Sequence, residues 1–240
     1  MVQDFGTLTK RLLENANKVI CIELDTRMIG ILNDRFKFYN NFKVINEDVL
    51  KVDLTKLIDE EKRENVGKIK NVKIVANLPY YITTPIIMKL LEERLDIESI
   101  TVMVQKEVAD RLVDVPGGKN SGAITYAINY YTEPEKVIDV PSTSFMPAPE
   151  VNSSVIKLKV LEKPAVKVKN EELLFKIIKL AFMQKRKTLL NALTNGKLGS
   201  KENIEEMLTN LEFNLKIRGE KLTLEDFAKI ADYYTKKLTK

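Results

Sequence analysis

Four consecutive residues, Asn77-Leu78-Pro79-Tyr80, carry the clearest chemistry in this sequence. They follow an apolar run, residues 72–76, so a strand would deliver them to its carboxyl end, where open α/β sheets place reactive groups. The Asn77 side-chain carbonyl and the Leu78 main-chain carbonyl could accept both hydrogens of an exocyclic amine, such as that of adenine, and aim its nitrogen at an electrophile. Pro79 restricts the local backbone, and Tyr80 offers a flat face for a base. A proline turn with a buried tyrosine is the alternative interpretation.

The residue types that the chain lacks narrow the chemistry further. Its 240 residues include no histidine and one cysteine, Cys21, which excludes histidine general bases, Ser-His-Asp nucleophiles, intrachain disulfides and His or Cys metal sites. Cys21 lies in an apolar run, where a small buried side chain is commoner than a reactive thiol. We therefore expect no metal, and catalysis by positioning, by carboxylates or by a reactive cosubstrate. The expected location is the cytoplasm, because no segment approaches the ~18 apolar residues of a membrane span.

Acidic residues follow two other predicted strands. Glu23 lies near the end of the apolar run 19–24 and is predicted to accept hydrogen bonds from ribose hydroxyls, while Asp25 would cap the next helix. Asp48 follows the strand predicted at 42–45 and could accept a hydrogen bond from an adenine amine. Acidic residues also follow strands and occupy turns for structural reasons, so each position alone leaves that interpretation open. Together they favour a cofactor that contains adenosine.

The elements that must position these residues alternate along the first two thirds of the chain. Apolar runs predict strands at 19–24, 42–45, 72–76, 100–104, 136–140 and 154–161, with helices at 8–15, 27–36, 84–94, 106–113 and 123–130. This alternation is typical of an α/β fold with a doubly wound, mostly parallel sheet covered on both faces. We assign it to a catalytic domain, residues 1–163.

The remainder, residues 164–240, is predicted to be a small all-helical domain. Helices are expected at 171–183, 187–194, 201–211 and 224–238. Residues 157–201 contain 12 Lys or Arg against 3 acidic residues, in a chain of net charge +5. Much of this charge could be an ordinary solvated helix face. The adjacent cations Lys185, Arg186 and Lys187, at an expected helix start, are a more specific candidate for gripping RNA phosphates.

The run from Asn77 to Pro85, NLPYYITTP, closely resembles the amino-methyltransferase motif of the small-subunit ribosomal RNA adenine dimethyltransferases, the KsgA type. The resemblance covers nearly the whole chain, and three further segments occur in the expected order: VQKEVADRL at 104–112, FMPAPEVNSSV at 145–155 and FMQKRKTLLN at 182–191. It implies a Rossmann-like class I methyltransferase fold with a C-terminal domain that contacts RNA.

The same resemblance implies a reaction and roles for individual residues. Methyl groups would pass from S-adenosylmethionine to N6 of two adjacent adenosines in the 3'-terminal hairpin loop of small-subunit (16S) rRNA, during ribosome biogenesis. Glu23 would bind the cofactor ribose and Asp48 its adenine, with Asn77 between cofactor and target amine. Phe145 would form the second aromatic wall, opposite Tyr80, around an adenine turned out of its loop. We expect a monomer whose partner is small-subunit rRNA or the pre-30S particle.

The N-terminus departs from the family pattern. The family's first strand ends in a Gly-Pro-Gly-x-Gly-like loop, and Gly6-Thr7-Leu8-Thr9 matches only the end of that loop. Residues 1–5 lack the earlier glycines, and the strand before them, central in such a sheet, would be missing. The expectation is therefore a truncated start and weak binding of S-adenosylmethionine.

Three alternatives stay open. The related large-subunit rRNA methyltransferases of the macrolide-resistance type share the catalytic chemistry, although the segments 184–187 and 145–155 favour the small-subunit type. A non-catalytic RNA-binding assembly factor is compatible with the incomplete cofactor loop. A small-molecule or DNA methyltransferase is also possible, because a fold alone does not choose a substrate.

Overall fold

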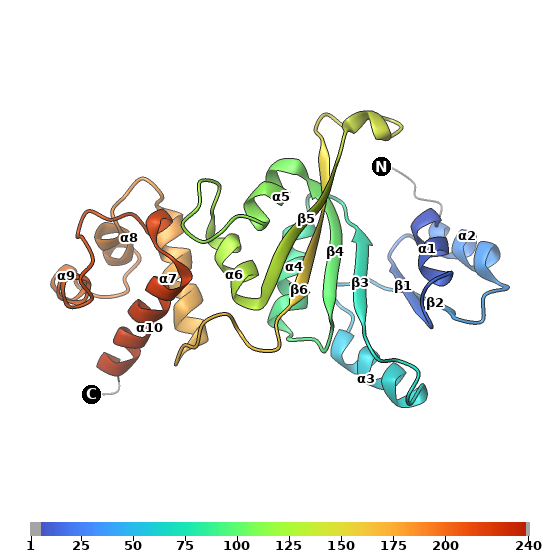
Figure 1. The fold of residues 1–240 in the computed structure, drawn as a ribbon, viewed down its shortest axis with the longest axis horizontal. Coiled ribbons are helices and arrows are strands. Elements are labelled where there is room, and N and C mark those ends of the chain that lie inside the picture. The colour runs from blue at the N-terminus through green and yellow to red at the C-terminus, as the bar shows by residue number, and fades with distance from the viewer. Residues whose placement is uncertain (1–5, 239–240) are drawn as a thin grey trace. The chain divides into compact units, whose positions relative to one another are not determined.

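The computed structural model describes residues 6–238, with side chains to residue 236. Helices and strands alternate from α1 to α5, and α6, β5 and β6 follow (Figure 1). The elements are α1 Thr7–Leu13, β1 Val19–Glu23, α2 Thr26–Phe36, β2 Phe42–Asn46, α3 Leu54–Glu64, β3 Lys73–Asn77, α4 Thr83–Glu92, β4 Ser99–Gln105, α5 Lys106–Leu112, α6 Ala123–Tyr131, β5 Thr132–Val140, the short 3-10 helix η1 Ser142–Ser144 and β6 Ser153–Val160. Every strand and helix predicted in this region has a counterpart.

The chain forms two compact units. Unit 1 comprises the residues up to Val102 together with Val140–Asn152, and unit 2 comprises Met103–Asp139 and the residues from Ser153 onward. The predicted boundary between residues 163 and 164 lies inside unit 2, so the domains 1–163 and 164–240 stay a prediction.

In unit 1, β1 and β2 pair in parallel and are covered by helices. Glu23, the last residue of β1, lies opposite Asn46, the last residue of β2. α1 and α2 pack on this pair and bury Leu13, Leu32 and Phe36. Burying a side chain of this size stabilises the fold by ~1.5–3 kcal/mol. This apolar cluster therefore holds the strand pair and its helices together.

The six strands form two sheets, one of β1 and β2 and one with the order β3-β4-β6-β5. β5 and β6 run antiparallel, because Glu133 pairs with Lys159 at one end and Asp139 bonds to Ser154 at the other. The alternating pattern had suggested a single, mostly parallel sheet. A local apolar pattern identifies a strand, but the choice of its neighbour depends on packing between segments distant in the chain.

One helix, α3, is absent from the predictions. Asp53 caps its N-terminus, and its inward side includes Leu54 and Glu61, which are both buried. The Glu61 carboxylate is paired with the ammonium groups of Lys18 at 2.7 Å and Lys43 at 2.8 Å. Because a helical pattern is recognised by its apolar positions, a carboxylate at an inward position concealed this helix.

Unit 2 ends in helices that pack against one another (Figure 1). They are α7 Glu171–Met183, α8 Leu189–Asn195, α9 Lys201–Asn210 and α10 Leu224–Leu238, with the short 3-10 helix η2 Gly219–Lys221 before α10. The four predicted helices are confirmed. α8 begins two residues later than predicted because Thr188 is its N-cap, and the Thr188 hydroxyl accepts a hydrogen bond from the Asn191 amide at 3.3 Å.

Tyr126 of α6 connects three parts of unit 2. Its hydroxyl donates a hydrogen bond to the Leu222 carbonyl at 2.5 Å and accepts one from the Gly117 amide at 3.1 Å. Its fully buried ring contacts Phe182 of α7 and Phe227 of α10, with ring centroids 5.3 and 5.1 Å away. Burial raises the pKa of Tyr126 to about 12, so the hydroxyl keeps the proton that it donates.

Candidate active site

Glu23 and Asn46 end the paired strands β1 and β2 at the carboxyl edge of the pair. The Asn46 amide group donates hydrogen bonds to the main-chain carbonyls of Glu23 at 2.9 Å and Leu24 at 3.3 Å. The half-buried Glu23 side chain accepts one from the Asp25 amide at 2.8 Å. These bonds fix the end of β1 and orient the Glu23 carboxylate. Asn46 is not among the residues predicted from the sequence, although a polar residue that ends an apolar strand is a signal for such a position.

Asp25 has a structural role, as predicted. Its carboxylate accepts a hydrogen bond from the Arg27 amide at 3.0 Å, which caps α2, and pairs with the Arg27 guanidinium at 2.6 Å. The hydrogen bonds from Arg27 hold the pKa of Asp25 below its usual value. With Asp25 engaged by its own helix, Glu23 is the better candidate for a ligand carboxylate at this edge.

Asp48 lies two residues beyond β2 and is half-buried. Its Oδ1 accepts a hydrogen bond from the Leu50 amide at 3.0 Å, and its main-chain carbonyl accepts one from the Lys51 amide at 2.8 Å. Asp48 therefore forms a turn with its own backbone, which is the structural role that the sequence left open for it. A carboxylate has two oxygens with about four acceptor positions, so the turn and a hydrogen bond from an adenine amine are compatible.

Cys21, in the middle of β1, is not a nucleophile. Burial, with a smaller contribution from the nearby Glu23 charge, raises the pKa of the thiol to about 11. Since the thiolate is the reactive form, this cysteine is inert near neutral pH. The finding agrees with the expectation of a packing role.

Gly6, at the N-terminus of α1, is the one loop glycine of the family pattern that falls among the described residues. Its φ is +86°, and a Cβ there would lie 2.9 Å from the Phe36 ring. Only glycine meets both conditions without strain. Residues 1–5, where the predicted loop would lack its earlier glycines, lie outside the described residues.

β3 ends at Asn77, whose side chain is exposed at the carboxyl end of the strand. A fixed turn follows. The Pro79 carbonyl accepts hydrogen bonds from the Ile82 amide at 3.1 Å and the Thr83 hydroxyl at 3.2 Å, and Thr83 is buried at the start of α4. The backbone at Leu78 is therefore anchored by a strand on one side and a hydrogen-bonded turn on the other.

Two aromatic residues follow in this turn with different surroundings. Tyr80, the predicted stacking ring, is half-buried, whereas Tyr81 is 86% exposed. The surroundings of a half-buried ring restrict its motion, and part of its face stays exposed for a base to stack on. Tyr80 is therefore the better candidate for a fixed stacking face.

Phe145 lies in the second part of unit 1, residues 140–152. η1 precedes it, and the Ser142 amide donates a hydrogen bond to the Asn152 side chain at 2.9 Å, which closes this segment. Phe145 is half-buried, whereas its neighbour Met146 is 92% exposed. Unit 1 thus contains all of the predicted catalytic and cofactor-binding residues, Glu23, Asp48, Asn77, Leu78, Tyr80 and Phe145.

The three predicted RNA-binding cations, Lys185, Arg186 and Lys187, are exposed in unit 2. They occupy the connection between α7 and α8 rather than the first turn of a helix, and the Lys187 amide donates a hydrogen bond to the Gln184 carbonyl at 2.8 Å. A tight turn therefore holds the three cations next to one another.

Lys185 also lines a polar cleft of about 510 Å³ in unit 2. The charged residues around the cleft are the cations Arg111, Lys119, Lys185 and Lys221 and the acids Glu107, Asp110 and Glu220. Lys119 and Lys221 are not predicted from the sequence, because they are distant along the chain from residues 185–187.

A family model for ribosomal RNA adenine dimethylases matches residues 5–236. The chain belongs to this family. Ribosomal RNA small subunit methyltransferase A of Lachnoclostridium phytofermentans is 50% identical over 236 residues, which cover 97% of this chain and 80% of the relative. The protein of the same name from Bacillus pumilus is 47% identical with the same coverage.

Solved structures agree with this membership of the ribosomal RNA adenine dimethylase family. A dimethyladenosine transferase from Plasmodium falciparum matches with a TM-score of 0.78 at 28% identity, covering 97% of this chain and 87% of that one. The 23S rRNA methyltransferase ErmE matches with a TM-score of 0.67 at 21% identity, covering 96% and 87%, which shows the fold alone. The predicted Rossmann-like methyltransferase fold with a C-terminal helical part is confirmed.

Within the described residues, no helix is long and apolar enough to cross a membrane. The same part of the chain contains no group of three or more His, Cys, Asp or Glu side chains arranged to hold a metal ion.

Proposed function

We propose that this protein transfers methyl groups from S-adenosylmethionine to N6 of two adjacent adenosines in the 3'-terminal hairpin loop of small-subunit rRNA. The observation that carries the proposal is Asn77-Leu78-Pro79-Tyr80 at the carboxyl end of β3, in a chain of the ribosomal RNA adenine dimethylase family. The 50% identical relative, named as a small-subunit methyltransferase, supports the choice of substrate.

The central chemical problem is the low nucleophilicity of the adenine amine, whose lone pair is delocalised into the ring. The Asn77 side-chain carbonyl and the Leu78 main-chain carbonyl accept the two amine hydrogens and hold the nitrogen pyramidal. The anchored turn after Leu78 fixes the direction of its carbonyl before the substrate arrives, so little reorganisation is needed during reaction. The alkylated nitrogen then releases its extra proton to water, which requires no histidine.

Unit 1 has side chains of the right kind to hold the cofactor. The Glu23 carboxylate, oriented by the Asp25 amide, accepts hydrogen bonds from ribose hydroxyls, and Asp48 accepts one from the adenine amine. S-adenosylmethionine, when bound, supplies an electrophilic sulfonium methyl group.

The target base needs a flat enclosure outside its own stack. Tyr80 and Phe145 are half-buried aromatic residues of unit 1 and are proposed to hold the extruded adenine between them. Stacking of this kind contributes ~1–3 kcal/mol per base. A single-stranded hairpin loop suits this mechanism because its bases are cheaper to extrude than those of a duplex.

The exposed cations Lys185, Arg186 and Lys187 are proposed to bind RNA phosphates. Their adjacency in a tight turn concentrates positive charge where a phosphate backbone can neutralise it and release counterions. This contact would hold the small-subunit RNA without reading its sequence.

Labelled S-adenosylmethionine and purified small and large ribosomal subunits test the proposal. We expect methylation of small subunits, and a loss of about 10²–10³-fold in rate for Asn77→Ala with RNA affinity retained. Asn33→Ala, an exposed position in α2, is the matched control and should keep full activity. Methylation of large subunits alone, or an unchanged rate for Asn77→Ala, would contradict the proposal.

A further inference from the structure

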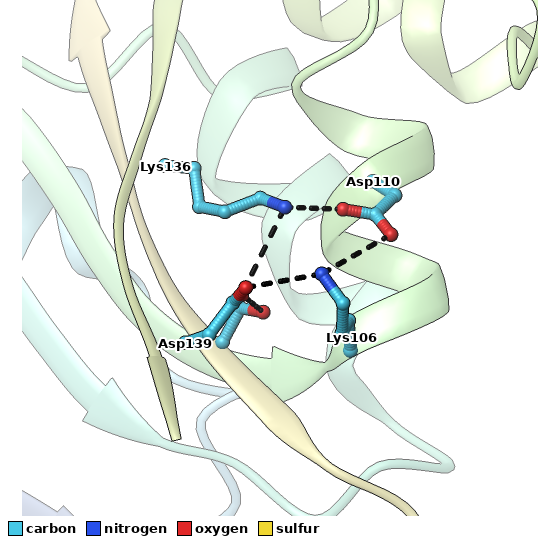
Figure 2. Close-up of polar contacts among 5 residues, drawn as sticks. Lys106, Asp110, Lys136 and Asp139 are labelled. Carbon is cyan, nitrogen blue, oxygen red and sulfur yellow. Dashed lines mark hydrogen bonds and ion pairs between the residues drawn. The ribbon is translucent and has the colours of Figure 1, made fainter. Parts of the chain in front are cut away.

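Two lysines and two aspartates alternate in a closed ring that joins α5 to β5 (Figure 2). Lys106 and Asp110 come from α5, and Lys136 and Asp139 come from β5. The Lys106 ammonium lies 3.1 Å from Asp139 and 3.6 Å from Asp110. The Lys136 ammonium contacts Asp110 and lies 3.8 Å from Asp139. Each charge in the ring therefore faces two charges of opposite sign.

Asp139 also has a partner in β6. The Ser154 hydroxyl donates a hydrogen bond to Asp139 Oδ1 at 2.6 Å, and Ser154 is fully buried. This bond, followed by the one from Lys106, holds the pKa of Asp139 below its usual range, so the carboxylate stays ionised near neutral pH. Asp139 is thus held by α5, by its own strand and by β6, all within unit 2.

The chain between Asp139 and Ser154, residues 140–153, contains the segment 140–152, which carries Phe145. The segment connects the paired strands β5 and β6, and the bond from Ser154 to Asp139 adds a side-chain contact at the point where the chain leaves one strand and enters the other. Inside the segment, the bond from the Ser142 amide to Asn152 closes it. Phe145 is three residues beyond Ser142. The two hydrogen bonds therefore restrict the backbone that leads to Phe145.

Global stability does not account for this arrangement well. The Asp139 side chain is 52% exposed and that of Lys106 is 40% exposed, and ion pairs in contact with water add little to folding stability. The contacts are concentrated where the chain leaves β5 and re-enters at β6. They are therefore better suited to setting the start and end of the segment than to stabilising the sheet.

We propose that Asp139 and Ser154 are positioning residues for the methyl-transfer reaction, and that their bond, braced by Lys106 and Lys136, fixes the segment that presents Phe145 to the target adenine. The proposal rests on the proposed function. Loss of the bond leaves the cofactor-binding carboxylates intact and displaces only the aromatic wall. Small displacements of positioning groups reduce rates by about 10–100-fold.

Two substitutions remove the bond without introducing bulk, Asp139→Ala and Ser154→Ala. Under single-turnover conditions with saturating RNA and cofactor, we expect methyl transfer to slow about tenfold, with cofactor affinity unchanged. Glu133→Ala is the matched control. It removes a β5–β6 ion pair, Glu133 with Lys159 at 3.1 Å, from the opposite end of the same strands, and should leave the rate unchanged.

Two further measurements separate positioning from a general structural role. If Asp139 acts through Phe145, Asp139→Ala should cost little in a Phe145→Ala background, so that the two substitutions are non-additive. Hydrogen exchange of the free protein reports the segment directly, because the Ser144 and Phe145 amides donate to the Pro141 and Ser142 carbonyls at 3.0 and 3.1 Å. We expect both amides to exchange faster in Ser154→Ala and to be unchanged in Glu133→Ala.

Each result has a defined meaning. Additive losses of rate for Asp139→Ala and Phe145→Ala would overturn the positioning role. Unchanged hydrogen exchange at residues 144 and 145 in both Asp139→Ala and Ser154→Ala would overturn it as well. Absence of methyl transfer by the unaltered protein would instead contradict the proposed function, and with it the catalytic part of the inference. The exchange measurement would still decide whether the bond holds the segment.

Discussion

Replacing Tyr126 with Phe isolates one hydroxyl at the centre of unit 2. The phenylalanine ring keeps the contacts with Phe182 and Phe227, so no cavity forms. The change removes the donor to the Leu222 carbonyl and the acceptor for the Gly117 amide. Its effect therefore measures those two hydrogen bonds.

The two backbone groups that lose their hydrogen-bond partner, the Leu222 carbonyl and the Gly117 amide, differ in their access to water. Leu222 is fully buried, so its carbonyl loses its partner without replacement, at a cost of ~1–3 kcal/mol. Gly117 is half-buried, and its amide loses a bond that water can partly replace, at a cost of ~0.5–1.5 kcal/mol. Together they predict a loss of about 1.5–4.5 kcal/mol, which lowers the melting temperature of a chain of this size by about 3–18 °C.

Thermal and urea unfolding followed by circular dichroism measure this loss. Tyr233→Phe is the matched control, because its hydroxyl accepts a hydrogen bond from the Asn210 side chain at 2.8 Å at an exposed position. A surface change of this kind should alter the free energy of unfolding by less than about 0.5 kcal/mol. If Tyr126→Phe destabilises no more than the control, the reasoning from buried, unpaired backbone groups is refuted.

Three further predictions concern charged groups. Glu61→Gln leaves Lys18 and Lys43 without their carboxylate and should reduce the free energy of unfolding at pH 7 by about 2–4 kcal/mol in urea titrations. Burial alone would raise the pKa of Glu61, but hydrogen bonds from the two lysines lower it on balance. The stability that the ionised carboxylate adds to the folded state is therefore lost as the pH falls below 4.5. A difference in unfolding free energy between the two proteins that grew in acid would contradict this account. Alanine at residues 185–187 should weaken small-subunit RNA binding and flatten the slope of log affinity against log salt concentration by about two. An unchanged slope would show that these cations do not bind RNA phosphates. Glu23→Gln should weaken S-adenosylmethionine binding by at least about tenfold in calorimetry, and equal affinity would exclude Glu23 as the ribose ligand.

Features that depend on neighbouring residues could be predicted from the sequence. Asp25 caps α2 through the amide of Arg27, two residues away, so the capping pattern is fully contained in the local sequence. β1 is a short apolar run that ends at a carboxylate, and Asn77 stands directly after another such run. The roles of Glu23 and Asp48 were predicted in the same way from carboxylates that follow apolar runs, and the resemblance to the family supplied the role of Phe145; all three roles remain proposals.

Features that depend on distant residues could not be predicted in this way. The bond from Ser154 to Asp139 and the bonds from Asn46 to the end of β1 join residues 15 to 23 positions apart, and no local pattern specifies them. The division of the strands into two sheets has the same origin. α3 was missed for another reason, because Glu61 uses a buried carboxylate where the pattern requires an apolar residue.

The composition of unit 1 has a consequence for synthesis on the ribosome. Its two parts, the residues up to Val102 and Val140–Asn152, are separated in the chain by Met103–Asp139. At ~5–20 residues per second, about 2–9 s pass between the translation of residue 102 and that of residue 145. During that time the nascent chain contains Glu23, Asp48 and Asn77 but not Phe145. A nascent or prematurely ended chain would therefore contain the carboxylates proposed to bind the cofactor before it has the aromatic wall proposed to hold a target adenine.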